Sequence, residues 1–374
     1  MSIPLVDLNA AYARQRADID AAMAEVVNSA QFINGPQVGL FEEAYAGFCG
    51  TRHAIGVGSG TAAVHLALVA LGIGPGDVVA VPAHTFIASV EPITWLGATP
   101  RFVDVEETTG CLDPVALKGA IDGVRAVMPV HLYGCPADLP AIAAVAEDAG
   151  VPVIEDAAQA QGAELTAPDG TIHRAGSYGR IGCFSFYPGK NLGAFGDAGA
   201  VTTDDDALAA SVRMLRDHGR TSKYEHQIVG YAHRLDTLQA AVLHAKLPGL
   251  AWANERRRAL AARYNSLLTG VGDLVVPIEP PGRRGIYHLY VLRTRHRDAL
   301  LAFLRERGIG AGVHYPVPIH RQPAYAHLGV PAGALPVTEA WARECLSLPL
   351  YPELLDEQQA RVVAAVTAFF ETAV

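Results

Sequence analysis

The sequence has little charge and no excess of positive charge. Only 18% of its residues are charged, and 29 Lys and Arg residues against 38 Asp and Glu residues give a formal net charge of −9 at pH 7. A general electrostatic attraction to nucleic acid or to an anionic membrane needs the opposite balance. We therefore expect neither as a partner, and any phosphate group must be bound by a few local groups.

Cysteine is scarce and never paired along the chain. The five cysteines, Cys49, Cys111, Cys135, Cys183 and Cys345, form none of the CxxC pairs typical of zinc sites or redox dithiols, so we expect no metal. The N-terminus lacks the basic start and apolar core of a secretory signal, and no apolar run approaches the roughly 20 residues of a membrane-spanning helix. These absences predict a cytoplasmic protein.

The residues that are present describe a large α/β protein. The chain has 374 residues, of which 50% are hydrophobic, and this length favours two unequal domains. Short apolar runs alternate with helical patterns, as is typical of strands covered by helices on both faces. We predict helices that begin near Thr61, Phe86, Asp138 and Asp205, and a mostly parallel seven-stranded sheet with strands at Ala54–Val57, Val78–Val81, Arg101–Val105, Ala126–Val130, Pro152–Glu155, Cys183–Phe186 and Ala200–Thr202.

The pattern changes after this region. Leu, Ala and Tyr recur at helical spacing from Asp236 to Leu268, which predicts one long connecting helix. A Pro- and Gly-rich stretch and a strand-like run at Tyr287–Arg293 follow. We expect a large domain over residues 1–248 and a smaller C-terminal α+β domain over residues 249–374.

A glycine-rich turn joins a predicted strand to a predicted helix at Gly56-Val57-Gly58-Ser59-Gly60-Thr61. Glycines let the backbone approach a ligand closely, and a helix N-terminus offers free N–H groups to a phosphate. The Ser and Thr hydroxyls suit a phosphate monoester. Two alternatives stay open: a tight turn that binds nothing, and a Rossmann dinucleotide site, for which the third glycine is misplaced.

Two further segments place reactive groups at strand ends. Val153-Ile154-Glu155-Asp156 is an apolar strand that ends in carboxylates, so Asp156 faces the ligand crevice of an open sheet unless it only caps the next helix. In Phe184–Gly193 a strand breaks at Pro-Gly and Lys190 follows at once. A lysine in so constrained a turn suits a Schiff base, whereas most lysines are solvated surface groups.

Together these segments supply the parts of a pyridoxal phosphate (PLP) site. A carboxylate at Asp156 keeps the pyridine nitrogen protonated, Lys190 forms the Schiff base, and the helix start holds the phosphate. A flat side chain should cover the ring, and Phe86 is placed to do so, with core packing as the alternative.

The chain resembles the DegT/DnrJ/StrS family of nucleotide-sugar aminotransferases, within the fold type I PLP enzymes, over nearly its whole length. The motifs that carry the resemblance are Phe32-Ile33-Asn34-Gly35-Pro36, Ser59-Gly60-Thr61, Pro129-Val130-His131-Leu132-Tyr133-Gly134, Glu155-Asp156-Ala157-Ala158-Gln159, Phe184-Ser185-Phe186-Tyr187-Pro188-Gly189-Lys190-Asn191-Leu192-Gly193, Arg234-Leu235-Asp236-Thr237-Leu238-Gln239-Ala240-Ala241 and His314-Tyr315-Pro316. The resemblance implies a homodimer with its active site at the subunit interface.

The resemblance also implies a role for each matching residue. Lys190 would bind PLP as a Schiff base and act as the general base, and Asp156 would hold the pyridine nitrogen. Gln159 would lie near the ring hydroxyl and Phe86 would stack on the ring. The phosphate would be held by Ser59, Gly60, Thr61 and Ser185.

The reaction implied by the resemblance is transfer of an amino group from glutamate to a nucleotide-linked keto sugar. Relatives that dehydrate sugars replace the lysine with histidine, so Lys190 favours transamination. The loop Pro188–Gly193 and the following Phe195-Gly196-Asp197 are more similar to the branch that acts on 3-keto-6-deoxyhexoses. A 4-keto sugar, or a regulatory relative that binds PLP without transferring an amine, is the alternative. Tyr315 and His320 are candidates for sugar contacts, against simple loop packing.

One position departs from the family's pattern. Asn is usual where this chain has Ala232, and that Asn contacts the phosphate from the partner subunit. A methyl group cannot form this hydrogen bond. Either His233, Lys223 or Arg220 compensates, or the phosphate is held less tightly.

Overall fold

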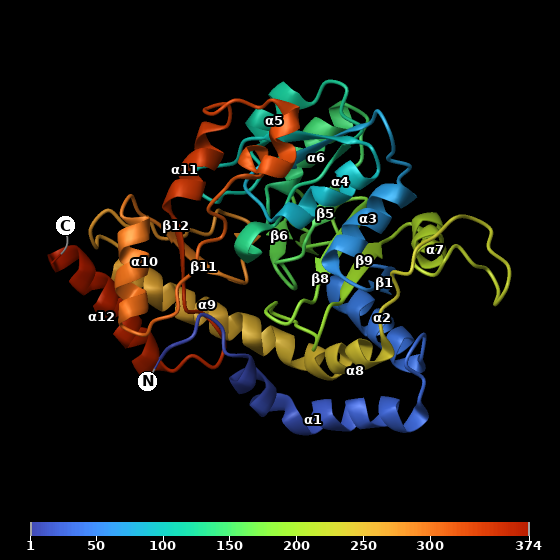
Figure 1. The fold of residues 1–374 in the computed structure, drawn as a ribbon, viewed down its shortest axis with the longest axis horizontal. Coiled ribbons are helices and arrows are strands. Elements are labelled where there is room, and N and C mark those ends of the chain that lie inside the picture. The colour runs from blue at the N-terminus through green and yellow to red at the C-terminus, as the bar shows by residue number, and fades with distance from the viewer. Residues whose placement is uncertain (1, 373–374) are drawn as a thin grey trace.

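Seven strands form one sheet through the larger part of the molecule (Figure 1). The computed structural model describes residues 2–372, and the seven strands are β1 (His53–Val57), β2 (Val78–Pro82), β3 (Thr99–Val103), β4 (Ala126–Val127), β5 (Ile154–Asp156), β8 (Ile181–Ser185) and β9 (Gly199–Thr203). Their spatial order is β1-β9-β8-β5-β4-β2-β3, because parallel bridges at Val127–Val153 and Val130–Asp156 join a four-stranded group to a three-stranded one. Strand β9 is antiparallel to both neighbours and the remaining pairs are parallel. The predicted mostly parallel seven-stranded sheet is confirmed.

Helices cover both faces of this sheet (Figure 1). Ile55 and Val57 of β1 share a core cluster with α3 (Gly60–Ala70) and α7 (Asp206–Leu215), whereas Ala54, next to Ile55, packs with α2 (Pro36–Cys49) and α8 (Thr237–Lys246). The helices α5 (Pro114–Ala120) and α6 (Leu139–Asp148) cover Ala80 and Val127 further along the sheet. Because successive side chains of a strand point to opposite faces, strands buried on both faces must be apolar throughout.

Side-chain caps begin three helices where the sequence predicts them. Ser59 Oγ accepts the N–H of Ala62 at 3.0 Å, and Asp138 and Asp205 cap α6 and α7 in the same way. The helix expected near Phe86 is instead a short 3-10 turn, η1 (Ile87–Ser89), followed by α4 (Glu91–Trp95). Phe86 offers no side chain to cap the turn, and no long helix begins there.

The long helix expected from Asp236 to Leu268 is interrupted. Helix α8 ends at Lys246, a 3-10 turn η3 (Leu247–Gly249) follows, and α9 (Leu250–Leu268) then begins. Pro248 has no N–H to donate within a continuous helix and crowds the preceding turn, so the prediction of a single helix was wrong.

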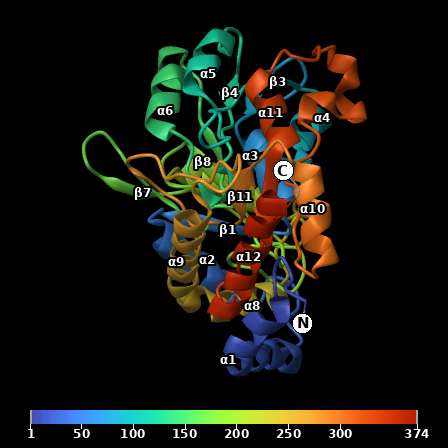
Figure 2. The ribbon, with the colours of Figure 1, turned by 90° about the vertical axis from the view of Figure 1, so that its left-hand side faces the viewer.

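The residues after α9 form a smaller α+β part. Strands β11 (Tyr290–Arg293) and β12 (Cys345–Leu348) pair antiparallel, and α10 (Arg297–Glu306), α11 (Pro336–Glu344) and α12 (Asp356–Thr372) surround them (Figure 2). The N-terminal segment packs with this part rather than with the large sheet. Ile3 pairs with Ile309 and shares a core with Leu292 and Leu304.

Several elements lie outside the sequence predictions. Helix α1 (Leu8–Ser29) runs alongside α8 (Figure 1), and a small sheet has the order β10 (Arg283–Arg284), β6 (Glu164–Thr166) and β7 (Ile172–Arg174). Three further 3-10 turns are η2 (Leu132–Gly134), η4 (Ile319–Arg321) and η5 (Pro323–Leu328). Between residues 2 and 372 no helix is both long enough and apolar enough to cross a membrane.

An aromatic cluster on one face of β8 fixes the strand that leads into the Lys190 loop. The Phe184 ring meets the Tyr45 ring edge-on at 5.2 Å, and the Phe186 ring lies 5.0 Å from Tyr45 and 5.4 Å from Phe41. Because side chains alternate along a strand, Ser185 between the two phenylalanines faces the opposite side, toward the start of α3.

We expect Phe184→Ala to lower the free energy of unfolding by about 3–5 kcal/mol, because it leaves a cavity in this fully buried cluster. Chemical denaturation followed by circular dichroism measures the change. Val115→Ala is the control, since Val115 is 80% exposed and its truncation opens no cavity. Equal small effects from both substitutions would contradict the importance assigned to the cluster.

Candidate active site

The start of α3 forms a close-fitting cradle beside β8. A Cβ atom at Gly60 would lie 2.5 Å from Cβ of Ser185, so only glycine lets the helix begin this close to the Ser185 hydroxyl. Ser59 is extended and caps the helix through Ala62, and the first N–H groups of a helix have no partner within it. The helix dipole and these N–H groups make the cradle suitable for an anion such as phosphate.

Asp156 ends β5 and is almost completely buried, with 3% of its surface exposed. Its Oδ2 accepts a hydrogen bond from Ser89 Oγ at 2.6 Å, and its Oδ1 accepts the N–H of Ala158 at 3.1 Å. No helix follows Asp156 directly, so the alternative that it only caps a helix does not apply. A buried carboxylate is stabilised only if hydrogen bonds and a nearby cation replace its hydration.

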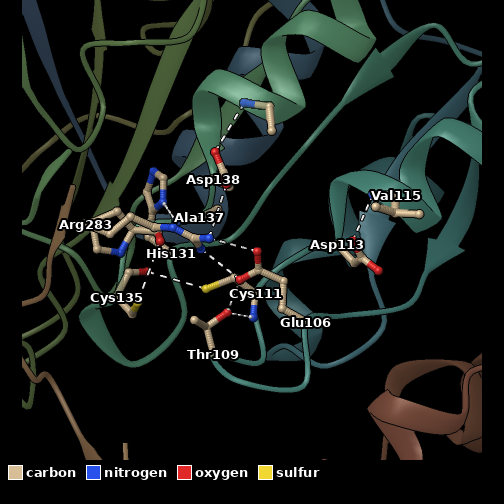
Figure 3. Close-up of polar contacts among 12 residues, drawn as sticks. Glu106, Thr109, Cys111, Asp113, Val115, His131, Cys135, Ala137, Asp138 and Arg283 are labelled. Atoms are coloured by element: carbon tan, nitrogen blue, oxygen red, sulfur yellow. Dashed lines mark hydrogen bonds and ion pairs between the residues drawn. The ribbon is translucent and has the colours of Figure 1, made fainter. Parts of the chain in front are cut away.

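The neighbouring carboxylate, Glu155, faces the opposite side and has its own partners. Its oxygens accept from His131 Nε2 at 2.9 Å and from the N–H groups of Gly176, Tyr178 and Gly179. Burial alone would raise the pKa of Glu155, but these hydrogen bonds outweigh it and lower the pKa. His131 Nδ1 accepts the N–H of Ala137 (Figure 3), so Nε2 carries the hydrogen that His131 donates to Glu155.

Lys190 lies in the turn that follows β8, and its N–H donates to the carbonyl of Tyr187 at 2.8 Å. Burial lowers the pKa of the Lys190 amine from its usual 10.5 to about 8, although the charge of Asp156 acts in the other direction. Asn191 anchors the turn by donating to Asn254 Oδ1 at 2.8 Å. A substantial fraction of Lys190 is therefore a neutral, nucleophilic amine near pH 8.

Two histidines, His288 and His314, lie near Lys190, and only His314 belongs to a motif quoted in the sequence analysis. Burial, with a smaller effect from the charge of Lys190, lowers the pKa of both His288 and His314. His314 Nδ1 is 2.8 Å from Ser347 Oγ. His288 lies about 100 residues beyond Lys190 in the chain and carries no motif that could have singled it out, whereas His314 stands within a recognised motif.

Phe86, Tyr315 and Gln159 form a connected group beside these residues. Phe86 is 52% exposed, which argues against core packing, and its ring lies 5.5 Å from that of Tyr315 at an angle of 35°. Gln159 Nε2 donates to the Tyr315 hydroxyl at 3.1 Å, and Gln159 Oε1 accepts the N–H of Tyr133 at 2.6 Å. The Tyr133 hydroxyl donates to the carbonyl of His314, so the loop that carries Tyr315 is held against the large sheet.

His320 and Ala232 lie apart from this group. His320 is buried, with Nε2 3.2 Å from Glu339 Oε1 and its ring 6.3 Å from Phe102, so its contacts are those of a packed residue. Ala232 pairs with Asp217, which also forms an ion pair with Arg220 at 2.6 Å. The carbonyl of His233 accepts the N–H of Gly58 at 2.9 Å, so within one chain His233 lies beside the turn that leads into the cradle.

The donors and acceptors of this group fit PLP. The cradle offers N–H and hydroxyl donors to the phosphate, Asp156 offers an anion to the protonated ring nitrogen, and Lys190 offers an amine to the aldehyde. Among residues 2–372 no cluster of three or more His, Cys, Asp or Glu side chains is arranged to hold a metal ion.

We expect Lys190 to react with an amine-modifying reagent, such as acetic anhydride, with a midpoint near pH 8. Its neutral form increases as the pH rises through its pKa of about 8, well below the ordinary lysine value of 10.5. Mass spectrometry of the modified peptides, with free lysine as the internal standard, gives the midpoint. A midpoint equal to that of free lysine would show that the amine is solvated.

Comparison with known proteins gives consistent matches over nearly the whole chain. The model of the DegT/DnrJ/EryC1/StrS aminotransferase family matches residues 13–367. A dTDP-3-amino-3,4,6-trideoxy-alpha-D-glucose transaminase from Streptomyces venezuelae is 47% identical over 99% of this chain and 96% of that protein. A pleiotropic regulatory protein from Geobacillus stearothermophilus is 45% identical over 99% of both proteins.

The solved structures agree with the sequence matches. DesV from S. venezuelae, in complex with a ketimine intermediate, has a TM-score of 0.95 and 47% identity over 99% of both chains. NtdA from Bacillus subtilis, with the cofactor PMP bound, has a TM-score of 0.91 and 30% identity over 99% of this chain and 86% of that one. The chain therefore belongs to the DegT/DnrJ/EryC1/StrS aminotransferase family and is a PLP-dependent aminotransferase.

Proposed function

We propose that this protein transfers an amino group from glutamate to the 3-keto group of a nucleotide-linked 6-deoxyhexose. The observation that carries the proposal is a buried lysine, Lys190, whose pKa burial lowers to about 8, close enough to the buried carboxylate of Asp156 for that charge to act on it. The S. venezuelae relative is named for a 3-amino sugar, which supports amination at C3. A 4-keto sugar is the alternative substrate, and the G. stearothermophilus relative makes a regulatory role without transfer the alternative function.

Each residue of the site contributes one task to this reaction. When bound, PLP supplies an electron sink that makes the Cα proton of the attached donor acidic. Lys190 holds the cofactor between turnovers and, as a neutral amine, takes the Cα proton of glutamate and later returns a proton to the carbon of the new amine. Asp156, held by Ser89, would keep a proton on the ring nitrogen, and Gln159, which also donates to Tyr315, would contact the ring hydroxyl.

The remaining residues bind and orient. Phe86 covers one face of the ring with its half-exposed side chain, and Tyr315 contacts the sugar from the smaller part. His320 is the weaker of the two sugar candidates, because its Nε2 is already occupied by Glu339. The phosphate is bound by the cradle, whose members are Ser59, Gly60, Thr61 and Ser185.

We also propose a domain division near residue 248, with the site between the two parts. The break at Pro248-Gly249 separates α8 from α9, which supports domains of 1–248 and 249–374. Tyr315 of the second part contacts Phe86 and Gln159 of the first. The N-terminal strand segment around Ile3 crosses to the second part, so the division is not strictly sequential.

The proposed partners are the two small-molecule substrates and a second copy of the chain. Nucleic acid and membranes are not expected, given the net charge of −9. We infer a cytoplasmic location, which suits a protein in which all five cysteines are free thiols.

The first test is the donor half of the reaction. The PLP-loaded protein, given glutamate without an acceptor, should change its visible spectrum and release one equivalent of 2-oxoglutarate per site. Lys190→Ala should release none, and Asp156→Asn should slow the release by at least about a hundredfold, since electrostatic contacts to developing charge are worth this much. Lys118→Ala, an exposed lysine on α5, is the control. Full turnover by Lys190→Ala would overturn the mechanism.

The acceptor is identified with a matched pair of 3-keto and 4-keto 6-deoxyhexoses on the same nucleotide. Amination of the 3-keto sugar alone supports the proposal. Amination of only the 4-keto sugar would overturn the position of the amine and leave the transaminase function standing. Reaction with glutamate but with neither sugar would point to a different acceptor, whereas a PLP-loaded protein that reacts with no amino donor would favour the regulatory alternative.

We expect a homodimer in sedimentation experiments. The loop between α7 and α8 projects from the body of the molecule (Figure 1) and exposes Tyr224 and Val229. Other large exposed apolar side chains are Phe86, Trp95 and Tyr187, and such surfaces are typical of protein–protein interfaces. Val229→Asp should weaken dimerisation, because Val229 is 91% exposed on that loop. Ile172→Asp, on the distant β6–β7 hairpin, is the control. A monomer at working concentration with full activity would refute the dimer.

A further inference from the structure

Two buried hydroxyl groups lie behind the carboxylate of Asp156. Ser89 Oγ is 2.6 Å from Asp156 Oδ2, and Thr85 Oγ1 is 2.8 Å from Ser89 Oγ. Thr85 and Ser89 are 2% and 3% exposed, so water does not compete for these contacts. Ser89 ends the 3-10 turn η1 that replaces the helix expected near Phe86, and Thr85 directly precedes Phe86.

The number of available protons sets the direction of this chain of hydrogen bonds. An ionised carboxylate can only accept hydrogen bonds, so the single hydroxyl proton of Ser89 must be donated to Asp156. Ser89 Oγ can then only accept from Thr85, which must be the donor. The chain therefore runs in one direction, from Thr85 through Ser89 to Asp156, and each bond polarises the next.

These contacts also fix how the Asp156 carboxylate is turned. Ser89 holds Oδ2 through a buried hydrogen bond while the N–H of Ala158 holds Oδ1 through a partly buried one, so rotation of the carboxylate plane would break both. The same turn carries Phe86, because the N–H of Ser89 donates to the Phe86 carbonyl at 3.1 Å. One short segment thus sets both the aromatic platform and the orientation of the carboxylate.

We propose that Ser89, supported by Thr85, is a positioning residue that orients the Asp156 carboxylate toward the ring nitrogen of the cofactor. This inference rests on the proposed function, in which Asp156 holds that nitrogen. Ser89 acts through Asp156 and does not itself touch the substrate. Loss of its hydroxyl weakens the hold on the ring nitrogen and slows the proton transfers at Lys190.

The test compares PLP affinity and kinetics in three variants. Ser89→Ala should raise the dissociation constant of PLP from the apoprotein by about tenfold, since hydrogen bonds to charged groups carry this weight. It should lower kcat with the KM of glutamate and sugar nucleotide little changed. Thr85→Val, which removes only the first donor, should give a smaller change of the same kind. Thr85→Ser keeps the donor and should lie nearer the wild type than Thr85→Val.

A kinetic isotope effect separates positioning from a merely structural role. With α-deuterated glutamate, Ser89→Ala should show a larger isotope effect on kcat than the wild type, because Cα proton transfer becomes more rate-limiting. Thr202→Val is the control for a lost buried hydroxyl. Thr202 Oγ1 donates to the carbonyl of Gly176 at 2.6 Å, and Thr202 lies in β9, which β8 separates from the β5 strand of Asp156. Its isotope effect and PLP affinity should match the wild type.

The outcomes distinguish this inference from the proposed function. If Ser89→Ala keeps the PLP affinity and isotope effect of the wild type, or changes them no more than Thr202→Val does, the positioning role is overturned while the aminotransferase proposal stands. If the wild type itself releases no 2-oxoglutarate from glutamate, the proposed function fails and this inference falls with it.

Discussion

A buried carboxylate at the end of β5 is the constraint on which the rest of the site depends. Removing a carboxylate from water costs several kcal/mol unless hydrogen bonds and a cation replace the lost hydration. Asp156 receives those hydrogen bonds from Ser89 and Ala158, which brings the turn after β2 against the end of β5. Burial lowers the pKa of Lys190, and the charge of Asp156 offsets part of this decrease. The result is an amine with a pKa of about 8.

Two adjacent carboxylates on β5 have different roles because successive side chains of a strand point to opposite faces of the sheet. Glu155 faces inward, and His131 and three backbone N–H groups satisfy both of its oxygens. Asp156, one residue later, points to the opposite face of the sheet and is held by two donors, so its oxygens can accept another hydrogen bond. The difference comes from the side of the sheet, since the residue types are nearly equivalent.

The sequence predicted the features that depend on local patterns and missed those that depend on contacts between distant segments. All seven strands of the sheet were recognised because strands buried on both faces must be apolar throughout. The break at Pro248 could have been predicted from the proline itself, but the helical spacing of the apolar residues on both sides favoured one continuous helix. The partnership of Ser89 with Asp156 spans 67 residues and His288 has no motif, so neither leaves a mark that one sequence can reveal.

The site also has an apolar surface and a negative charge, which favour different kinds of ligand, and one ligand can suit both. Phe86 presents an apolar face that is 52% exposed, which favours contact with a flat ring. Asp156, beside it, presents a buried negative charge, which favours a cation. A purely apolar ligand would leave the carboxylate uncompensated, and a simple cation would leave the aromatic face in water. A flat ring that carries a protonated nitrogen at its edge and a phosphate within reach of the α3 N-terminus satisfies both demands, and PLP has this form.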